Sequence, residues 1–212
     1  VAAWLQRADI IHATTIAPIA APCPVVVTLF DALDFHPRWR PSRIWSVYVR
    51  TIGALAARRA DAVITGTRAS AIEVASKFRT STDNMHVIPL GSTLTPTNPA
   101  TPVDLPTDPY VLLVGSDSPR KDFTTALAAV ARLRATGGDI SVVVTGRPPP
   151  AYRNVSWITE RHNVDDATLT VLYQHASAVI VPSRHEGFGL PVVEARTLGV
   201  PVVASDIPAL RE

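Results

Sequence analysis

Several residue types are scarce in this sequence, and each scarcity narrows the functions open to it. Among 212 residues there is one cysteine, Cys23, so an internal disulfide is excluded and a cysteine-based metal cluster is not expected. Lysine supplies two of the 20 basic residues, Lys77 and Lys121, and the arginines are scattered rather than clustered. With a net charge of only +2, the chain shows no footprint of nucleic-acid binding.

Long apolar runs and two familiar catalytic patterns are also absent. The first apolar run is broken by Arg7 and Asp9, and no other run reaches the length of a membrane span. No Gly-x-Gly-x-x-Gly follows a predicted strand, which argues against a dinucleotide-dependent oxidoreductase. The sequence also offers no acid-base triad and no obvious nucleophile.

What the sequence does contain is enough apolar material for a folded core and a pattern that divides it in two. Apolar residues make up 47% of the chain. Residues 92–109 hold five prolines and no glycine, which predicts a stiff, extended linker. We therefore expect a first lobe at 1–91 and a second at 110–212.

Within each lobe, short β-branched runs alternate with helical patterns. A helix is predicted from Pro41, with Ile44, Tyr48, Ile52 and Leu55 sharing one face. Ser70 to Glu73 has the spacing of a capping box and is expected to open a further helix. Strands are predicted at 25–29, 61–65, 86–89, 110–115, 140–145, 155–159, 178–181 and 200–204, and further helices at 123–136, 165–173 and 190–198.

This alternation predicts βαβ units and parallel sheets, which makes the chain an α/β protein. Such sheets bind ligands at the carboxyl ends of their strands. A doubly wound lobe usually has five or six strands, whereas the first lobe shows about four, and no helix is expected after the strand at 200–204. Both lobes are therefore expected to be incomplete.

The most informative segment is residues 182–195, which follows a predicted strand and opens a helix. Gly187 and Gly189 permit close approach of the backbone to a ligand, and the helix start favours an anion such as a diphosphate. Glu194, about one turn into the helix, is placed to accept hydrogen bonds from both hydroxyls of a ribose. Glu186 is placed to stabilise positive charge at an anomeric carbon. The alternative is an ordinary turn with surface carboxylates.

A second strand-to-helix loop, residues 115–122, carries Arg120 and Lys121. A cation beside a helix N-terminus can hold phosphate oxygens, with arginine acting as a fork and lysine as a point charge. The alternative is a solvated helix start.

These two segments together resemble those of the retaining glycosyltransferases of family 4. The stretch EGFGLPVVE, residues 186–194, is similar to the E-x7-E signature of that family, and the loop from Gly115 to Lys121 is similar to its Gly-x-x-x-Pro-Arg-Lys loop. The resemblance implies a GT-B fold of two Rossmann-like lobes and assigns a catalytic role to Glu186. It assigns donor binding to Gly115, Ser116, Arg120, Lys121, Gly187, Phe188, Gly189, Leu190 and Glu194.

Two positions depart from the family pattern. Many members carry arginine directly after the first glycine of the basic loop, where this chain has Ser116, so that phosphate contact is expected either to be absent or to be supplied by Arg120. Many also have His-Asp at the end of a first-lobe strand, where this chain has Phe30 and Asp31. A phenyl ring cannot hydrogen-bond a sugar hydroxyl, so either Asp31 takes more of the catalytic polar work or this lobe handles its substrates differently. The alternative for Asp31 is that it caps the following turn.

The resemblance implies transfer of a hexose, mannose-like or glucose-like, from a nucleoside-diphosphate sugar to an acceptor hydroxyl with retention of configuration. The acceptor is expected to be a glycan, a lipid-linked sugar or a small molecule, and neither a metal nor another cofactor is expected. The family also implies a cytoplasmic enzyme with peripheral membrane contact. The alternatives are a nucleotide-sugar epimerase of the same fold and a non-catalytic lobe that binds nucleotide sugars.

Overall fold

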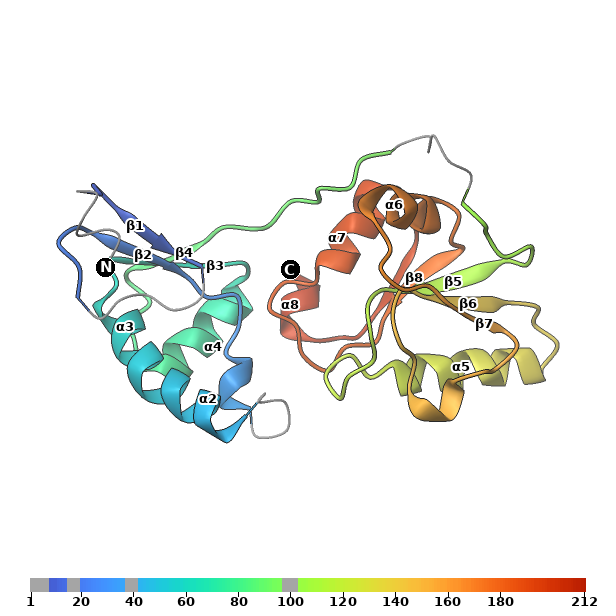
Figure 1. Ribbon diagram of the computed structural model, residues 1–212, viewed down its shortest axis with the longest axis horizontal. Coiled ribbons are helices and arrows are strands. Elements are labelled where there is room, and N and C mark those ends of the chain that lie inside the picture. Colours follow the sequence, from blue (N-terminus) through green and yellow to red (C-terminus); the bar gives the residue numbers. More distant parts are fainter. Residues whose placement is uncertain (1–7, 15–19, 37–41, 97–102) are drawn as a thin grey trace. The chain divides into compact units, whose positions relative to one another are not determined.

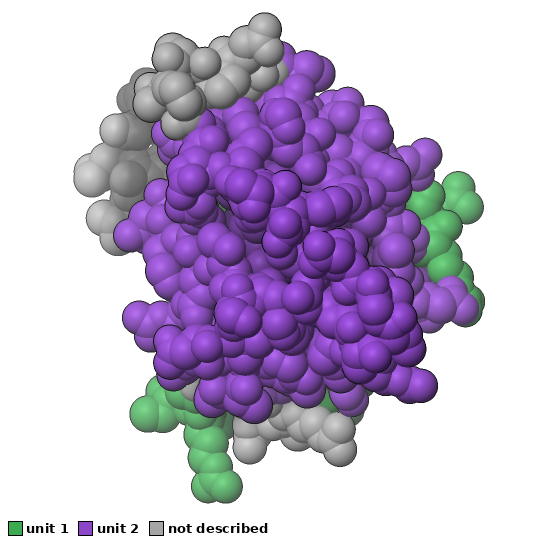
Figure 2. All heavy atoms as spheres, turned by 90° about the vertical axis from the view of Figure 1, so that its right-hand side faces the viewer, with its two compact units in different colours: residues 1–90, 186–188, 211–212 green, residues 91–185, 189–210 purple. Residues whose placement is uncertain are grey.

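The chain forms two compact units, each built on its own parallel sheet. In the computed structural model, the described residues are 8–14, 20–36, 42–96 and 103–212. Figure 2 colours the two units separately. Unit 1 comprises Val1–Leu90, Glu186–Phe188 and Arg211–Glu212, and unit 2 comprises Gly91–His185 and Gly189–Leu210.

In the described part of unit 1, four parallel strands lie in the order β1-β2-β3-β4, and the helices lie on one face of the sheet (Figure 1). Neighbouring strands are held in register, with Val27 beside Val63. The strand predicted at 86–89 is observed at Met85–Val87, so it begins one residue earlier than predicted. The elements are β1 (Ile11–Ala13), β2 (Val25–Thr28), the 3-10 turn η1 (Leu33–Phe35), α2 (Arg43–Tyr48), the π-helical turn η2 (Val49–Gly53), α3 (Ala54–Arg59), β3 (Ala62–Thr65), α4 (Arg68–Phe78) and β4 (Met85–Val87).

The helical run from α2 through η2 to α3 faces the sheet differently from the prediction. Its predicted helical face is turned outward, because Ile44 is 86% exposed and Tyr48 and Ile52 are more than a third exposed. The side buried in the core instead carries small residues and one valine, so that the helix can approach the sheet closely. These buried residues are Val49, Gly53, Ala54, Ala56 and Ala57. The start predicted at Pro41 lies outside the described residues; α2 begins at Arg43 behind the cap Ser42.

The N-terminal cap of α4 is also not the residue that the spacing suggested. Thr67, in extended conformation, accepts a hydrogen bond from the backbone N–H of Ser70, and α4 begins at Arg68. The prediction of a capping box at Ser70–Glu73 was wrong by one turn, because Ser70 is itself buried inside the helix. The existence of the helix is confirmed.

Unit 2 has five parallel strands among the described residues, in the order β7-β6-β5-β8-β9. The chain lays down β5, β6 and β7 in one direction and then returns to place β8 and β9 on the other side of β5. The elements are β5 (Tyr110–Leu113), α5 (Phe123–Ala135), β6 (Ser141–Val144), the 3-10 turn η3 (Pro150–Tyr152), β7 (Ile158–Glu160), α6 (Asp166–Gln174), β8 (Ala178–Val181), α7 (Leu190–Thr197), β9 (Val202–Ala204) and α8 (Pro208–Arg211).

Both faces of the sheet in unit 2 are covered, with α5 on one side and α6 and α7 on the other (Figure 1). Alternate residues of β5 point to opposite faces. Val111 and Leu113 pack with Phe123 and Leu127 of α5, whereas Leu112 packs with Tyr173 of α6 and other residues of the second core. This two-sided burial explains why β5 and β6 read as continuous apolar runs rather than as alternating patterns.

Two further differences from the sequence prediction concern irregular segments. A helix, α8, does follow β9, because Pro208 is able to begin a helical turn there. The proline-rich segment is not simply a spacer, since Leu94 is 3% exposed within the second core and Val103 and Leu105 pack against it. Within the described ranges, no helix combines the length and the apolar character needed to cross a membrane.

Candidate functional site

The strand order of unit 2 places its two sequence motifs at one position. The order reverses between β5 and β8, and a sheet of this type binds ligands in the crevice outside the carboxyl ends of the strands at such a switch point. The loop after β5 holds residues 114–122, and the loop after β8 holds residues 182–189. These are the basic loop and the signature segment identified from the sequence.

Hydrogen bonds join these two loops within unit 2. The N–H of Arg184 donates to the carbonyl of Arg120 over 2.8 Å, and Nη1 of Arg120 donates to the carbonyl of His185 over 3.1 Å. Nε of Arg184 lies 2.8 Å from Oδ2 of Asp122. One guanidinium that the sequence assigned to phosphate binding therefore also holds the signature loop in place.

Lys121 folds back over the end of its own strand. Its Nζ donates to the carbonyl of Val114 over 2.8 Å and lies 6.0 Å from the centre of the Phe123 ring. Gly115, at φ +91°, leaves room for this ammonium group, because a Cβ there would lie 2.5 Å from Nζ. An ammonium group has three donors, and the carbonyl of Val114 accepts from one of them.

The start of α5 is less open to an anion than the sequence suggested. The N–H of Phe123 donates to Oδ1 of Asp117, and the N–H of Lys121 donates to Oγ of Ser118. The N–H of Asp122 donates to the carbonyl of Ser118. Since these amides are satisfied within the loop, a phosphate near α5 would be held by side chains rather than by the helix terminus.

Ser116 packs against the loop that follows β6. Its Oγ accepts from the N–H of Arg147 over 3.2 Å, and the N–H of Asp117 donates to the carbonyl of Arg147 over 2.8 Å. Gly146 permits this approach, because a Cβ there would lie 2.5 Å from Oγ of Ser116. Arg147 is exposed, and its guanidinium has no hydrogen-bond or ion-pair partner among the described residues. The sequence analysis missed this arginine, since only the pairing of β5 with β6 brings it beside Ser116.

Glu194 is the fifth residue of α7, so its predicted position about one turn into the helix is confirmed. Its Oε2 accepts a hydrogen bond of 2.5 Å from the hydroxyl of Tyr173 on α6. Burial, followed by this hydrogen bond and the charge of Glu194, raises the pKa of Tyr173, so the phenol stays protonated and donates. The sequence analysis missed Tyr173 as well; the available signal was a buried tyrosine whose hydroxyl needs a partner.

Gly189 forms the cap of α7 at φ +91°. A Cβ at this position would be strained and would also lie 2.3 Å from Cδ2 of Leu210. Glycine at this position therefore has a structural reason, and the close approach of a ligand to its backbone stays a prediction. Leu190 and Pro191 then form the first turn of the helix, where Leu190 is 40% exposed.

The remaining predicted residues belong to unit 1. Glu186, Gly187 and Phe188 group with it, as does Asp31. Oδ1 of Asp31 accepts from the N–H of Leu33 over 3.1 Å, so the turn-capping interpretation is observed, and a catalytic role for Asp31 stays a prediction.

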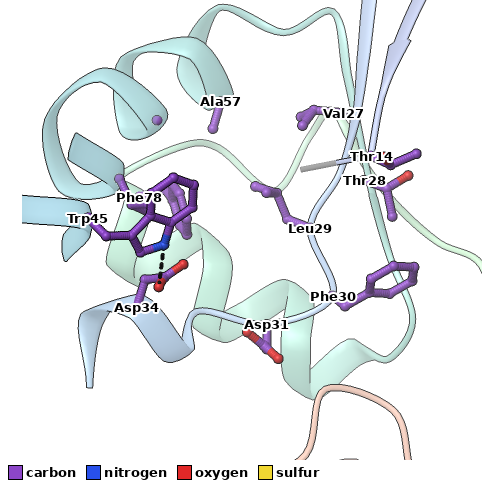
Figure 3. Close-up of a pocket in the computed structure, with 12 residues that line it drawn as sticks. Thr14, Val27, Thr28, Leu29, Phe30, Asp31, Asp34, Trp45, Ala57 and Phe78 are labelled. Carbon is purple, nitrogen blue, oxygen red and sulfur yellow. Dashed lines mark hydrogen bonds between the residues drawn. The ribbon is translucent and has the colours of Figure 1, made fainter. Parts of the chain in front are cut away.

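Unit 1 also contains a cavity of about 300 Å³ beside the end of β2 (Figure 3). Its lining combines apolar residues such as Val49 and Phe78 with the carboxylates of Asp31 and Asp34. Nε1 of Trp45 donates to Oδ1 of Asp34 over 2.9 Å, and this bond orients the indole at the cavity. An apolar pocket with a few polar groups is the usual form of a small-molecule site.

In the parts of the chain that the structure describes, no three His, Cys, Asp or Glu side chains are grouped so as to hold a metal ion. The expectation of a reaction without a metal stays a prediction.

The fold and this site define a class of protein: a two-unit α/β protein that carries basic and acidic side chains around the switch point of its second sheet. The chain belongs to the glycosyl transferases group 1, whose family model matches residues 101–212. The model of glycosyltransferase family 4 matches residues 1–95. The resemblance to this glycosyltransferase family inferred from the signature segment is thereby confirmed, and retention of configuration stays a prediction.

Curated relatives include several mannosyltransferases. The chain is 31% identical over 118 residues to the serotype-specific mannosyltransferase WbdA of Escherichia coli, a match covering 49% of this chain and 14% of that protein. It is 30% identical over 165 residues to the MMP alpha-(1->4)-mannosyltransferase of Mycolicibacterium hassiacum, covering 74% of this chain and 39% of the relative. The chain thus spans well under two thirds of the length of these relatives.

Among solved structures, the sucrose-phosphate synthase of Thermosynechococcus elongatus aligns with a TM-score of 0.75 at 20% identity, over 99% of this chain and 59% of that one. This likeness is one of fold. Together with the two parallel-sheet units, it confirms the predicted GT-B architecture.

Proposed function

We propose that the protein transfers a hexose, mannose-like or glucose-like, from a nucleoside-diphosphate sugar to an acceptor hydroxyl with retention of configuration. One observation carries this proposal: at the switch point of the second sheet, the basic loop after β5 is hydrogen-bonded to the signature loop after β8. Membership in the glycosyl transferases group 1 supports the reaction class, and the mannosyltransferases among the relatives favour a mannose-like sugar.

In this proposal the donor binds unit 2. Arg120 and Lys121 on the loop after β5 and Arg147 on the loop after β6 bring positive charge to this edge of the sheet, and the start of α7 adds its helix dipole. The diphosphate is placed there, and Glu194 accepts hydrogen bonds from the ribose. Gly115, Ser116, Gly187, Phe188, Gly189 and Leu190 keep their assignment as donor-binding residues.

The chemistry follows from stabilising the leaving group. As the bond between the anomeric carbon and the diphosphate breaks, the cations and the helix dipole neutralise the charge that builds on the diphosphate, in the place of a metal ion. The carboxylate of Glu186 faces the positive charge that develops on the sugar. The acceptor oxygen then bonds to the anomeric carbon on the face that the diphosphate leaves, and its proton passes to the departing diphosphate.

The acceptor is proposed to bind unit 1, in the cavity beside β2. Asp31 and Asp34 offer hydrogen-bond acceptors to its hydroxyls, and the oriented indole of Trp45 offers an apolar surface for a sugar ring. Glycan, lipid-linked and small-molecule acceptors all meet these requirements.

The test is calorimetric titration with UDP, GDP, ADP and NAD, followed by transfer assays with the matching sugar donors. We expect one nucleoside diphosphate to bind. Both Lys121→Ala and Glu194→Ala should weaken that binding by roughly 10- to 100-fold, because each removes a charge-assisted contact. Lys77→Ala is the matched control, since Lys77 is the other lysine of the chain and is exposed on α4.

Each alternative has its own result. Donor turnover without an acceptor, giving an altered sugar, would identify an epimerase. Donor binding without any turnover would identify a non-catalytic lobe. Folded protein that binds none of the diphosphates would overturn the proposal, and transfer that stops on removal of metal ions by a chelator would overturn its metal-free form.

A further inference from the structure

A buried hydroxyl inside unit 2 touches the carboxylate proposed to read the ribose. The side chain of Tyr173 is fully buried, at 0% exposure, in the core between the sheet and helices α6 and α7. Its hydroxyl donates to Oε2 of Glu194 over 2.5 Å. Glu194, which accepts this bond, is only partly buried. The core therefore fixes the donor of the bond, whereas its acceptor lies where a ligand can reach it.

The bond constrains a side chain that would otherwise be mobile. Glutamate has three rotatable side-chain bonds, and ordering them costs conformational entropy each time a ligand binds. The Tyr173 ring is fully buried in the core cluster that also contains Leu112 and Ala195, and this packing restricts its movement. The position of Oε2 is therefore set before any ligand arrives.

The bond also leaves the carboxylate able to act. A carboxylate has about four lone-pair sites, and Tyr173 uses one of them, on Oε2. Oε1 and the second lone pair of Oε2 remain for the two hydroxyls of a ribose. When the carboxylate is already fixed, both hydrogen bonds to the ribose form without further ordering of the Glu194 side chain. The two hydroxyls together therefore add more to the binding free energy than a single hydroxyl does.

We propose that Tyr173 is a positioning residue that holds Glu194 in the orientation that recognises the ribose diol. The preference of the donor site for ribose over 2′-deoxyribose would then depend on a phenol that never touches the ligand. This inference rests on the proposed function, since it assigns Tyr173 a part in donor recognition.

The chain supplies a matched control in Tyr110. Its side chain is 2% exposed in the same core, and its hydroxyl donates to the carbonyl of Leu172 over 2.8 Å. Tyr110→Phe and Tyr173→Phe each remove one buried hydroxyl and one hydrogen bond. Only Tyr173→Phe removes a contact with Glu194.

The experiment measures the dissociation constants of a diphosphate and its 2′-deoxy analogue, UDP with 2′-deoxy-UDP or GDP with 2′-deoxy-GDP, by calorimetry. The full chain and both Phe variants are titrated. We expect the wild type to prefer the ribonucleotide by about tenfold, the worth of one hydrogen bond to a charged group. Tyr110→Phe should keep this ratio. Tyr173→Phe should lower it several-fold, mainly by weakening the ribonucleotide.

A double-mutant cycle separates positioning from general stability. In the Glu194→Ala background, Tyr173→Phe should cause no further loss of ribonucleotide affinity, because the residue through which it acts is gone. Thermal unfolding of both Phe variants verifies that they are folded. Since Tyr173→Phe keeps the ring and removes a single oxygen, the core packing is retained.

The outcomes distinguish this inference from the function on which it rests. If Tyr173→Phe weakens both nucleotides equally, or keeps the wild-type ratio, Tyr173 is structural and the inference is wrong while the donor site stands. If the wild type binds no diphosphate, or Glu194→Ala binds as well as the wild type, the proposed donor site fails and the inference fails with it.

Discussion

Lys121 reaches the end of β5 only because residue 115 has no side chain. Its Nζ would lie 2.5 Å from a Cβ at Gly115, closer than two nonbonded atoms can approach. The same glycine adopts φ +91°, which side-chain-bearing residues rarely do. Gly115 therefore serves the proposed phosphate site twice, by shaping the loop and by admitting the ammonium group.

Replacing Gly115 with alanine should displace Lys121 from the carbonyl of Val114. We expect diphosphate affinity to fall by about tenfold, the worth of one charge-assisted contact, as measured by calorimetry. Gly137→Ala is the control, because Gly137 has φ +93° but no atom within 4 Å of an added Cβ. Both variants carry a similar backbone strain of about 1–2 kcal/mol, so equal losses of affinity would contradict the role given to Lys121.

At this scale the sequence indicated which residues to examine but not what they touch. The signature segment singled out Glu194, and the basic loop singled out Lys121, because those residue types at that spacing are distinctive. Tyr173 and Arg147 were not found, since their roles depend on contacts between α6 and α7 and between the loops after β5 and β6. The use of Asp117 to cap α5 is likewise a tertiary detail that spacing does not encode.

Among the elements, the helical run from Arg43 to Arg59 has an unusual division of its residues. Small residues and Val49 face the core, whereas large apolar residues including Ile44 and Val47 face outward. The hydroxyl of Thr51, on η2, donates to the carbonyl of Val47 over 2.7 Å, which turns this polar group back onto the helix. Contiguous apolar surface of this kind is typical of a face that contacts another surface.

Two alanine substitutions on this run should therefore have opposite outcomes. Val49→Ala removes two buried methyl groups beside the unit 1 cavity and should lower the free energy of unfolding by about 1–2 kcal/mol. Ile44→Ala, at a position 86% exposed, should change it by no more than about 0.5 kcal/mol. Urea unfolding measures both; a larger loss for Ile44→Ala would show that the outward face is covered in solution.

The same run shows where prediction of the fold from sequence reached its limit. The strands were predicted almost completely, because β-branched runs such as that of β2 are strong local signals. The helices were predicted too, but a period of 3.6 residues reveals a common face without revealing which way it points. In this run the smaller residues are the buried ones, since alanine and glycine allow the helix to lie close to the sheet.

For the whole molecule, the two units have separate cores. Val63 is fully buried in the core of unit 1, and Leu127 is fully buried in a core of unit 2. Residues of the proline-rich segment, such as Leu94, pack with the second unit. Each unit therefore has the apolar interior needed to unfold as a cooperative body of its own.

We expect two transitions when unfolding is followed by hydrogen exchange in increasing denaturant. Val63→Ala should lower the midpoint only for amides of unit 1, and Leu127→Ala only for amides of unit 2. Leu127→Ala should lower the free energy of unfolding of unit 2 by about 2–5 kcal/mol, because it deletes a larger buried side chain than Val63→Ala does. A single transition that both substitutions shift equally would show that the two units unfold as one.

The strand pairing of these sheets also governs how quickly the native state can form. Every pair of neighbouring strands described here is parallel, so no sheet can begin from a hairpin between successive strands. Val111 of β5 pairs with Ala178 of β8, a separation of 178 − 111 = 67 residues. Long-range closure of this kind slows folding.

During synthesis the strands of unit 1 up to Val87 emerge early, whereas the central strand of unit 2 keeps an open edge until β8 has been made. Until then, that edge is exposed to pairing with another molecule, which chaperones would have to prevent.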